Sequence, residues 1–414
     1  MKLISGLKQL IYVMVVLFLT ACVFVSCTKT DVNAIPGKYD PNGKAPGSTG
    51  SGTTTGGTGT TNSDSTSTAL FSSPDDVAVD AAGNLYVADY GNNLIRKITT
   101  AGIVTTLAGN GTIGANNGPG ATASFSGPSG VAVDNAGNIY VADAGNNLIR
   151  KITPDGIVST LAGTVAAVDT SNTVTSEPLF SSPSGVAVDA SGNVYVADAG
   201  NNEIRVVSSA GVVNTLAGNL NAGASDGTGS NATFNNPTGI AVDGSGNVYV
   251  ADLLNNLIRK ITPGGVVTTI AGSGSTGSND GVGALASFYF PNSLAVDASG
   301  NLYVTDALNN LIRKVAPDGT VSTIAGNGSA GFLNGIGTAT SFNDPAGIAV
   351  DGTGNLFVAD ANNNLIRKIT PAGQVTTVAG TIPSISVIRN TAHNLYHVGS
   401  RKLASRFSLR NKSR

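Results

Sequence analysis

The feature that most limits the fold of this chain is a unit of about 54 residues that occurs six times in succession. A proline opens each unit, and successive prolines are 54, 55, 54, 54 and 54 residues apart. These prolines are Pro74, Pro128, Pro183, Pro237, Pro291 and Pro345. A fixed period of this length is typical of a repeat architecture, in which each unit buries apolar surface against its neighbours. We therefore expect one repeat domain, although a length of 414 residues would ordinarily suggest about three domains.

Each unit contains four short apolar runs separated by Gly, Asn and Asp. In the second unit the runs are 128–134, 138–143, 147–152 and 157–163. Apolar runs of this length between turn-forming residues predict β-strands. Glycine makes up 54 of 414 residues, about twice the usual share, as frequent turns require. The first two runs are almost continuously apolar, which predicts strands covered on both faces, and the more polar fourth run predicts an outer strand.

Six four-stranded units predict radial closure into an all-β, six-bladed β-propeller with antiparallel blades. The alternative is a superhelical solenoid, which needs polar capping repeats at its ends. Units one and six show no such change. A phenylalanine precedes units two to six, and Phe71 precedes unit one in the same way, so 69–380 contains six complete blades. The sequence leaves open whether the ring closes with complete blades or with a strand shared between the first and the last.

The repeated unit resembles a known family. The pattern Pro-x-Gly-Val-Ala-Val-Asp-x-x-Gly-Asn-x-Tyr-Val-Ala-Asp-x-x-Asn-Asn-x-Ile-Arg is similar to the NHL repeat of six-bladed β-propellers, and it covers 69–380. The resemblance implies the fold but no single function, because the family includes enzymes and pure binding modules. Peptide-amidating lyases and streptogramin lyases of propeller type rely on histidine. Since 69–380 contains no histidine, the resemblance does not carry their activities over.

Charged side chains are scarce and follow the repeat. They are 12% of the chain, and 69–380 has 11 Lys or Arg against 22 Asp or Glu, a net charge of 11 − 22 = −11. All 11 cations fall in one position of the unit, whose arginines are Arg96, Arg150, Arg205, Arg259, Arg313 and Arg367. One aspartate ends the first strand of each unit, as Asp80, Asp134, Asp189, Asp243, Asp297 and Asp351. Another ends the second strand, as Asp89, Asp143, Asp198, Asp252, Asp306 and Asp360.

We interpret these repeated charges as structural. An aspartate before x-x-Gly-Asn can accept backbone N–H bonds in a turn. An arginine can pair with a neighbouring aspartate while its stem covers apolar surface. The alternative is a sixfold ring of ligand-binding charges. Because the whole chain carries a net charge of only −2, we expect no nucleic-acid partner.

Residue types that perform catalysis are nearly missing from the repeats. The segment 69–380 contains no His, Cys, Met or Trp, which removes histidine metal sites, cysteine nucleophiles and Ser-His arrangements. We therefore predict no catalytic residue, no metal and no cofactor, and a module that binds or scaffolds a protein or a glycan. The alternative is a metal-assisted hydrolase or lyase of lactonase-like type, built from Glu203, Glu177 and Asp169. We expect Glu203 instead to be a solvated strand residue, where other blades carry leucine.

Departures from the repeat are where a recognition surface should be sought, because shared positions maintain the blade. The candidates are Asp169, Glu203, Leu253, Leu254, Tyr289 and Phe290. Asp169 lies in the connection 164–177, which replaces an Asn/Asp-Gly-x-Gly pattern that recurs between other blades. We interpret that pattern as tight turns, with weak Ca²⁺ sites as the alternative. For each candidate, drift of a blade without function is the alternative.

Residues 1–27 resemble a bacterial lipoprotein signal peptide. A basic start precedes an uncharged, mostly apolar run of 15 residues at 11–25, which is short for a membrane-spanning helix of about 20 residues. A transmembrane anchor is the alternative. Cys22 and Cys27 each follow a small residue, as the lipidated cysteine of such signals does. We prefer Cys27, because polar residues follow it at once, and keep Cys22 as the alternative; neither precedes an Asp, which by the resemblance favours the outer over the inner membrane.

The remaining segments surround the repeats. Residues 28–68 are a Gly/Ser/Thr-rich linker without apolar periodicity, and as a flexible coil they reach about 35 Å. Residues 381–414 hold seven Lys or Arg, both histidines and no acid. We expect this tail to be disordered; the alternatives are a basic arm for acidic polymers or lipid headgroups, and a non-native end of the reading frame. The sequence thus predicts an exported, membrane-anchored, monomeric propeller.

Overall fold

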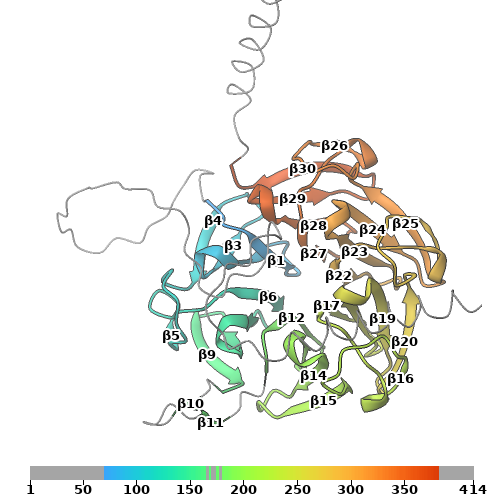
Figure 1. Ribbon diagram of the computed structural model, residues 1–414. Helices are drawn as coiled ribbons and strands as arrows, with labels where there is room; N and C mark the ends of the chain where they lie inside the picture. The colour runs from blue at the N-terminus through green and yellow to red at the C-terminus, as the bar shows by residue number, and fades with distance from the viewer. Residues whose placement is uncertain (1–69, 165–166, 169–173, 177–179, 382–414) are drawn as a thin grey trace, which may run out of the picture. The chain divides into compact units, whose positions relative to one another are not determined.

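The computed structural model describes residues 70–164, 167–168, 174–176 and 180–381, all within one compact unit of the chain. These residues form a six-bladed, all-β propeller (Figure 1). Each blade is an antiparallel sheet in which four strands follow one another in chain order. The predicted fold class is therefore confirmed. Strands run from Pro74 to Ala379, inside the predicted propeller segment; the boundaries predicted for the signal, linker and tail lie outside the described residues.

The strands of each blade are named from the axis outward. The innermost strands are β1 (Pro74–Val79), β6 (Pro128–Val133), β12 (Pro183–Val188), β17 (Pro237–Val242), β22 (Pro291–Val296) and β27 (Pro345–Val350). The second strands are β2 (Leu85–Asp89), β7 (Ile139–Asp143), β13 (Val194–Asp198), β18 (Val248–Asp252), β23 (Leu302–Asp306) and β28 (Leu356–Asp360). The third strands are β3 (Leu94–Ile98), β8 (Leu148–Ile152), β14 (Glu203–Val207), β19 (Leu257–Ile261), β24 (Leu311–Val315) and β29 (Leu365–Ile369). The outer strands are β4 (Val104–Ala108), β9 (Ile157–Ala162), β15 (Val213–Gly218), β20 (Val266–Ala271), β25 (Thr320–Ala325) and β30 (Gln374–Ala379).

Burial along the strands explains their apolar patterns. Every residue of β2 and of β7 is buried, because each second strand is covered on both faces by neighbouring blades. The outer strand β4 is buried only at its two ends, as its Thr-Thr centre requires. The antiparallel register pairs Val77 with Val87, and Val87 with Arg96. The prediction that the second strand is covered on both faces and that the fourth is an outer strand is therefore confirmed.

The ring closes with complete blades. Strand β1 contacts both β6 of the next blade and β27 of the last blade. An apolar cluster between the last and first blades joins Leu85 and Val87 to Phe357 and Ala359. Because every four-stranded sheet comes from one continuous stretch of chain, no strand is shared between the ends of the described propeller. Blade one lies opposite blade four, since three steps around the ring separate them in either direction.

Short elements complete several blades. A two-residue fifth strand pairs with the outer strand of blades two, four, five and six, as β5 (Gly118–Pro119), β16 (Gly227–Thr228), β21 (Gly281–Val282) and β26 (Gly335–Ile336). Before blade three, β10 (Ala167–Val168) and β11 (Val174–Ser176) instead pair with each other. The helical turns are single 3₁₀ turns, and no helix in the described ranges is long and apolar enough to cross a membrane.

One face of the propeller is defined by where the inner strands begin. There each second strand ends in an aspartate, and a 3₁₀ turn follows, as η1 (Tyr90–Asn92), η2 (Ala144–Asn146), η3 (Ala199–Asn201), η5 (Leu253–Asn255), η7 (Ala307–Asn309) and η9 (Ala361–Asn363). Each turn is capped by an asparagine in the left-handed conformation, such as Asn147 with φ 56°. We call this end of the propeller the strand-start face.

Candidate functional site

In blades two, four, five and six the repeated aspartate and arginine are joined in a buried network. In blade two, Arg150 Nη1 donates to Asp143 Oδ2 at 2.7 Å, and both side chains are fully buried. Asp143 Oδ1 also accepts the backbone N–H of Ser126 at 2.7 Å. Arg150 Nη2 donates to Asn117 Oδ1 at 2.7 Å, and its guanidinium lies 5.2 Å from the ring of Phe125. These charges hold the blade to the loop that enters it, so they are not available to a ligand.

The Asn/Asp-Gly-x-Gly loops belong to the same network. Their first residues, Asn117, Asp226, Asp280 and Asn334, each accept a hydrogen bond from the arginine of the blade that follows. Burial raises the pKa of Asp143 above its ordinary value, and the hydrogen bonds from Ser126, Asn146 and Arg150 oppose that rise. The arrangement is found in blades two, four, five and six with a 2.7 Å arginine–aspartate pair in each.

The aspartate that ends each inner strand organises the turn on the opposite face. Asp134 Oδ1 accepts the backbone N–H groups of Ala136 and Asn138 at 2.9 and 2.8 Å, and its Oδ2 accepts the hydroxyl of Tyr140 at 3.1 Å. Burial works against ionisation here, but the hydrogen bonds outweigh it and hold the pKa of Asp134 below its ordinary value. Lys151 lies over the Tyr140 ring at 5.6 Å. This position is likewise used by the fold.

Glu203 is not the solvated residue that the sequence suggested. It is 9% exposed, and its Oε2 lies 3.2 Å from Arg205 Nη1. Blade three lacks the Asn/Asp-Gly-x-Gly loop whose side chain contacts the arginine in four other blades. Glu203 supplies a carboxylate to Arg205 from within the blade. Its negative charge also contributes to a raised pKa of Asp198, which burial brings to about 6.

The other pieces of the predicted metal-assisted site are not brought together. Glu177 and Asp169 lie outside the residues whose side chains the structure describes. Within the described residues, no group of three or more His, Cys, Asp or Glu could hold a metal ion. Cys22, Cys27 and the basic tail also lie outside the described part of the chain.

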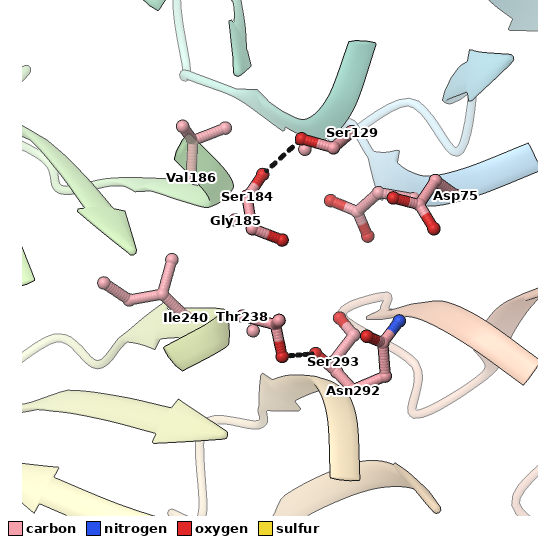
Figure 2. Close-up of a pocket in the computed structure, with 12 residues that line it drawn as sticks. Asp75, Ser129, Ser184, Gly185, Val186, Thr238, Ile240, Asn292 and Ser293 are labelled. Carbon is pink, nitrogen blue, oxygen red and sulfur yellow. Dashed lines mark hydrogen bonds between the residues drawn. The ribbon is translucent and has the colours of Figure 1, made fainter. Parts of the chain in front are cut away.

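A pocket lies on the propeller axis at the strand-start face (Figure 2). It is lined by the second and third residues of the inner strands of blades one to five, together with Val186 and Ile240. Its volume is about 300 Å³, which includes solvent at its mouth. Its centre has room for about one water molecule or ion. Polar donors of the lining bridge the blades: Ser129 Oγ donates to the Ser184 carbonyl at 2.9 Å, and Thr238 Oγ1 to the Asn292 carbonyl at 2.7 Å.

Asp75 and Asp76 give this pocket two carboxylates, both from blade one. In blades two, three, four and six the position of Asp76 is a glycine, because a methyl group there would collide with the next inner strand, as at Gly130 against the Ser184 carbonyl. Asp76 reaches across this gap instead, and its Oδ2 accepts the backbone N–H of Val131 at 3.0 Å. Burial raises the pKa of Asp76 to about 8.

Asp75 and Asp76 were not among the site residues predicted from the sequence. The signal was present, because Pro-Asp-Asp at Pro74 departs from the Pro-x-Gly pattern of the repeat. The predicted departures lie in the connecting segments and at the strand ends. What the sequence did not indicate is that this position faces the axis.

The four predicted residues of blades four and five lie together on the strand-start face. Leu253 and Leu254 begin the turn η5, whose capping residue Asn256 accepts the backbone N–H of Phe290 at 3.0 Å. The rings of Tyr289 and Phe290 meet edge to face at 5.3 Å. Leu308 of η7 joins the group, because its backbone N–H donates to the Tyr289 carbonyl at 3.1 Å. We call Leu254, Tyr289, Phe290 and Leu308 the apolar patch. Of these, Leu254, Tyr289 and Leu308 are 44%, 37% and 38% exposed.

Comparisons with known proteins agree with this geometry. The profile of the NHL repeat matches residues 71–98, 125–152, 180–207 and 342–369, and that of the teneurin NHL domain matches 221–288. The matched segments fall in five of the six blades. The chain therefore carries NHL repeats, in a six-bladed β-propeller.

Curated relatives share only this part of their length. The chain is 31% identical over 254 residues to the protein SUPPRESSOR OF QUENCHING 1, chloroplastic, of Arabidopsis thaliana. It is 31% identical over 273 residues to NHL repeat-containing protein 2 of Bos taurus. Each alignment covers 57% of this chain, but only 24% and 38% of those proteins. The chain thus spans less than two fifths of the length of either relative.

Two solved structures share the fold. An auxiliary nutrient binding protein from Bacteroides thetaiotaomicron superimposes with a TM-score of 0.55 and 17% identity, over 74% of this chain and 70% of that one. A streptogramin B lyase superimposes with a TM-score of 0.50 and 15% identity, over 77% of this chain and 86% of that one. At these identities the likeness shows the fold alone.

Proposed function

We propose that this chain, an NHL-repeat propeller, is a non-catalytic binding or scaffolding module for a protein or a glycan. The observation that carries the proposal is the distribution of residues that differ between blades. Positions shared by all blades are occupied by the buried networks and the turns. Blade-specific side chains gather on the strand-start face, as the axial carboxylates Asp75 and Asp76 and the apolar patch.

The size of the axial pocket supports surface binding. The pocket's volume of about 300 Å³ includes open solvent, and its enclosed centre holds only about one water molecule. It therefore cannot enclose a metabolite, because pockets for drug-sized ligands occupy roughly 300–1,000 Å³ and bury most of the ligand. Recognition therefore has to use the surface around the pocket mouth. The Bacteroides protein named above is an auxiliary nutrient binding protein, so a propeller of this kind serves binding elsewhere.

The test is capture of a partner by the full chain. Immobilised protein is exposed to envelope extracts and to a glycan array, and retained species are identified. A specific partner with micromolar or tighter affinity supports the proposal. Absence of any specific partner among proteins and glycans at micromolar concentration would count decisively against it.

A metal-assisted hydrolase or lyase of lactonase-like type is the second candidate, and it takes support from the two axial carboxylates. Asp75 and Asp76 supply oxygen ligands of the kind that Ca²⁺ and Mg²⁺ prefer. Titration with Ca²⁺, Mg²⁺ or Zn²⁺ during thermal melting tests this candidate. The candidate predicts a metal-dependent rise in the melting temperature of the full chain that is lost in the Asp76→Asn variant. Absence of this rise in the full chain, or an equal rise in the Asp76→Asn variant, would eliminate it.

We further propose that the chain is exported and anchored to the outer membrane through a lipidated Cys27, with Cys22 as the alternative. The proposal rests on the sequence of residues 1–27. Membrane retention is compared between the native chain and the Cys27→Ser and Cys22→Ser variants. Release by Cys27→Ser alone supports the assignment, and retention of both single variants and of the double variant would refute lipid anchoring.

A further inference from the structure

The loops that enter blades two, four, five and six differ in one chemical group. The Asn/Asp-Gly-x-Gly pattern begins with Asn117 in blade two and Asn334 in blade six, and with Asp226 and Asp280 in blades four and five. Each of the four side chains accepts a hydrogen bond from the arginine of the blade that follows, at 2.7 to 2.9 Å. One position thus holds an amide in two blades and a carboxylate in two others, and a glycine follows it in all four.

A carboxylate makes full use of this position. Asp226 Oδ2 accepts the backbone N–H of Thr269 at 3.0 Å, and Asp226 Oδ1 accepts the Thr269 hydroxyl at 3.0 Å. Burial opposes ionisation of Asp226, but the hydrogen bonds from Thr269 and Arg259 outweigh it and hold the pKa below its ordinary value. Asp280 is bonded to Thr323 in the same way. The position therefore favours an ionised side chain.

An amide makes only part of these contacts. Arginine only donates, so Asn117 presents Oδ1 to Arg150 and has only Nδ2, itself a donor, for its other contacts. Within the described residues the corresponding threonine, Thr160, bonds to Asn117 only through its hydroxyl, at 3.3 Å. Thr377 bonds to Asn334 in the same way, at 3.5 Å. Conversion of the amide to a carboxylate would add a second acceptor, and a negative charge beside a buried arginine.

We propose that Asn117 and Asn334 are sites of intramolecular deamidation, at which the folded chain converts its own asparagine to aspartate. Both side chains are exposed, so water, the one co-reactant of the conversion, reaches them. The products reproduce the side chains that blades four and five already carry at this position. This inference goes beyond the proposed binding function and does not depend on it.

The conversion at Asn117 passes through a cyclic imide. The backbone nitrogen of Gly118 gives its proton to solvent and attacks Asn117 Cγ. The new C–N bond closes a five-membered ring, and the bond from Cγ to Nδ2 breaks as ammonia leaves with a proton from solvent. Glycine has no side chain to obstruct this attack. One water molecule then cleaves the bond between Cγ and the Gly118 nitrogen, which leaves the peptide bond intact and an aspartate in place of the asparagine.

Arg150 is placed to favour both steps. Attack on Cγ, first by nitrogen and then by water, puts negative charge on Asn117 Oδ1. That oxygen already accepts a hydrogen bond from Arg150 Nη2 at 2.7 Å, and the arginine side chain is fully buried. A fixed donor directed at a developing oxyanion lowers the barrier, so opening of the ring at Cγ is favoured over opening at the main-chain carbonyl, which gives isoaspartate. Arg367 Nη2 holds Asn334 Oδ1 in the same way, at 2.9 Å.

Two other asparagines of the described chain are matched controls. Asn110 and Asn327 are also exposed and are also followed by glycine. Their Oδ1 atoms accept the backbone N–H of Thr112 and of Ser329, each at 2.9 Å, and among the described residues no arginine donates to them. The same dipeptide is thus present in one molecule with and without the arginine.

The experiment incubates the full chain at pH 7 and pH 9 and follows the four sites by peptide mass spectrometry that separates aspartate from isoaspartate. We expect conversion at Asn117 and Asn334 to be at least about tenfold faster than at Asn110 and Asn327, with aspartate as the main product. The rate should be higher at pH 9, because the attacking nitrogen must lose its proton. Equal or slower conversion at Asn117 and Asn334, or isoaspartate as their main product, would overturn the inference.

Two variants test the role of the arginine and the fate of the product. In Arg150→Met the rate at Asn117 should fall to that at Asn110, while Asn334 keeps its rate; an unchanged ratio of Asn117 to Asn334 would refute the part assigned to Arg150. Because this variant is also expected to destabilise its blade, the product is tested separately. Asn117→Asp should raise the urea midpoint above that of the freshly purified native chain, and a lower midpoint would contradict the match between this position and a carboxylate.

Discussion

Arg150 Nη1 lies 2.7 Å from Asp143 Oδ2, and neither side chain is exposed to solvent. Blades four, five and six repeat this pair at the same distance. In blade one, Arg96 Nη1 is 4.0 Å from Asp89 Oδ2, and the arginine side chain is 13% exposed. The arginine–aspartate pair is thus closer and more buried in some blades than in blade one, and its contribution to stability should differ accordingly.

Replacing Arg150 with methionine should destabilise the protein by about 3–5 kcal/mol, because it leaves Asp143 as a buried charge without its partner. Arg96→Met should cost less, since the blade-one pair is longer and partly solvated. Urea unfolding of the two variants at neutral pH measures both values. Equal losses in the free energy of unfolding of the two variants would contradict the larger contribution expected of the buried pair in blade two.

Replacing Phe290 with asparagine should stabilise the protein by up to about 1 kcal/mol, because asparagine tolerates φ 58° better than phenylalanine. The lost contact with the Tyr289 ring, 5.3 Å away, reduces the gain. The reciprocal change Asn236→Phe, at φ 53° in blade four, should destabilise by about the same amount. Denaturant midpoints of the pair provide the measurement, and a stabilising Asn236→Phe would contradict the argument.

Stability should fall as the pH rises from about 4 to about 8, and Asp76 should be one cause. Burial raises its pKa from 3.8 to about 8 in the folded chain, so across this interval the folded state holds a proton that the unfolded state has lost. Asp76→Asn removes this contribution, and the loss of stability between pH 6 and pH 8 should become smaller. The urea midpoint at pH 5, 6, 7, 8 and 9 tests it. An unchanged slope above pH 6 would exclude Asp76 as the titrating group.

Asp198 should contribute in a narrower interval. Its pKa is raised to about 6, mainly by burial and partly by Glu203, so its destabilising effect develops between about pH 4 and pH 6 and is constant above. Glu203→Gln removes the nearby negative charge, which should lower the pKa of Asp198 and reduce the loss of stability in this interval. Unfolding midpoints at pH 4, 5 and 6 provide the comparison, and an equal loss of stability in the native chain and the Glu203→Gln variant would contradict this prediction.

Much of the fold could be read from the sequence because the repeat supplies six copies of each signal. The spacing of the prolines, the apolar second strands and the turn-forming Asn and Gly residues agree in every unit, so the propeller and its strand order followed directly. Leu253, Leu254, Tyr289 and Phe290 stood out as departures from that repeat. Asp76 was missed for a physical reason: in an extended strand a departure from glycine does not reveal whether the side chain faces an axis, a neighbouring blade or solvent.

Glu203 shows the opposite error. A glutamate at a strand position where other blades carry leucine suggested a solvent-exposed side chain. Folding places it beside Arg205, whose counterparts in four blades contact a side chain from a connecting loop. In blade three a strand residue thus takes the place of the loop residue as partner of the arginine. This can be recognised only from the positions of the loop and the blade in the folded structure.

The sequence by itself determined the number of blades and the order of their strands. These follow from local patterns, since each blade is one continuous stretch of chain that must bury the same surfaces. Tertiary structure decided what the irregular residues do. Closing the ring brings the axial carboxylates of blade one and the apolar patch of blades four and five to the same face, although more than 160 residues separate Asp76 from Leu254 and Tyr289.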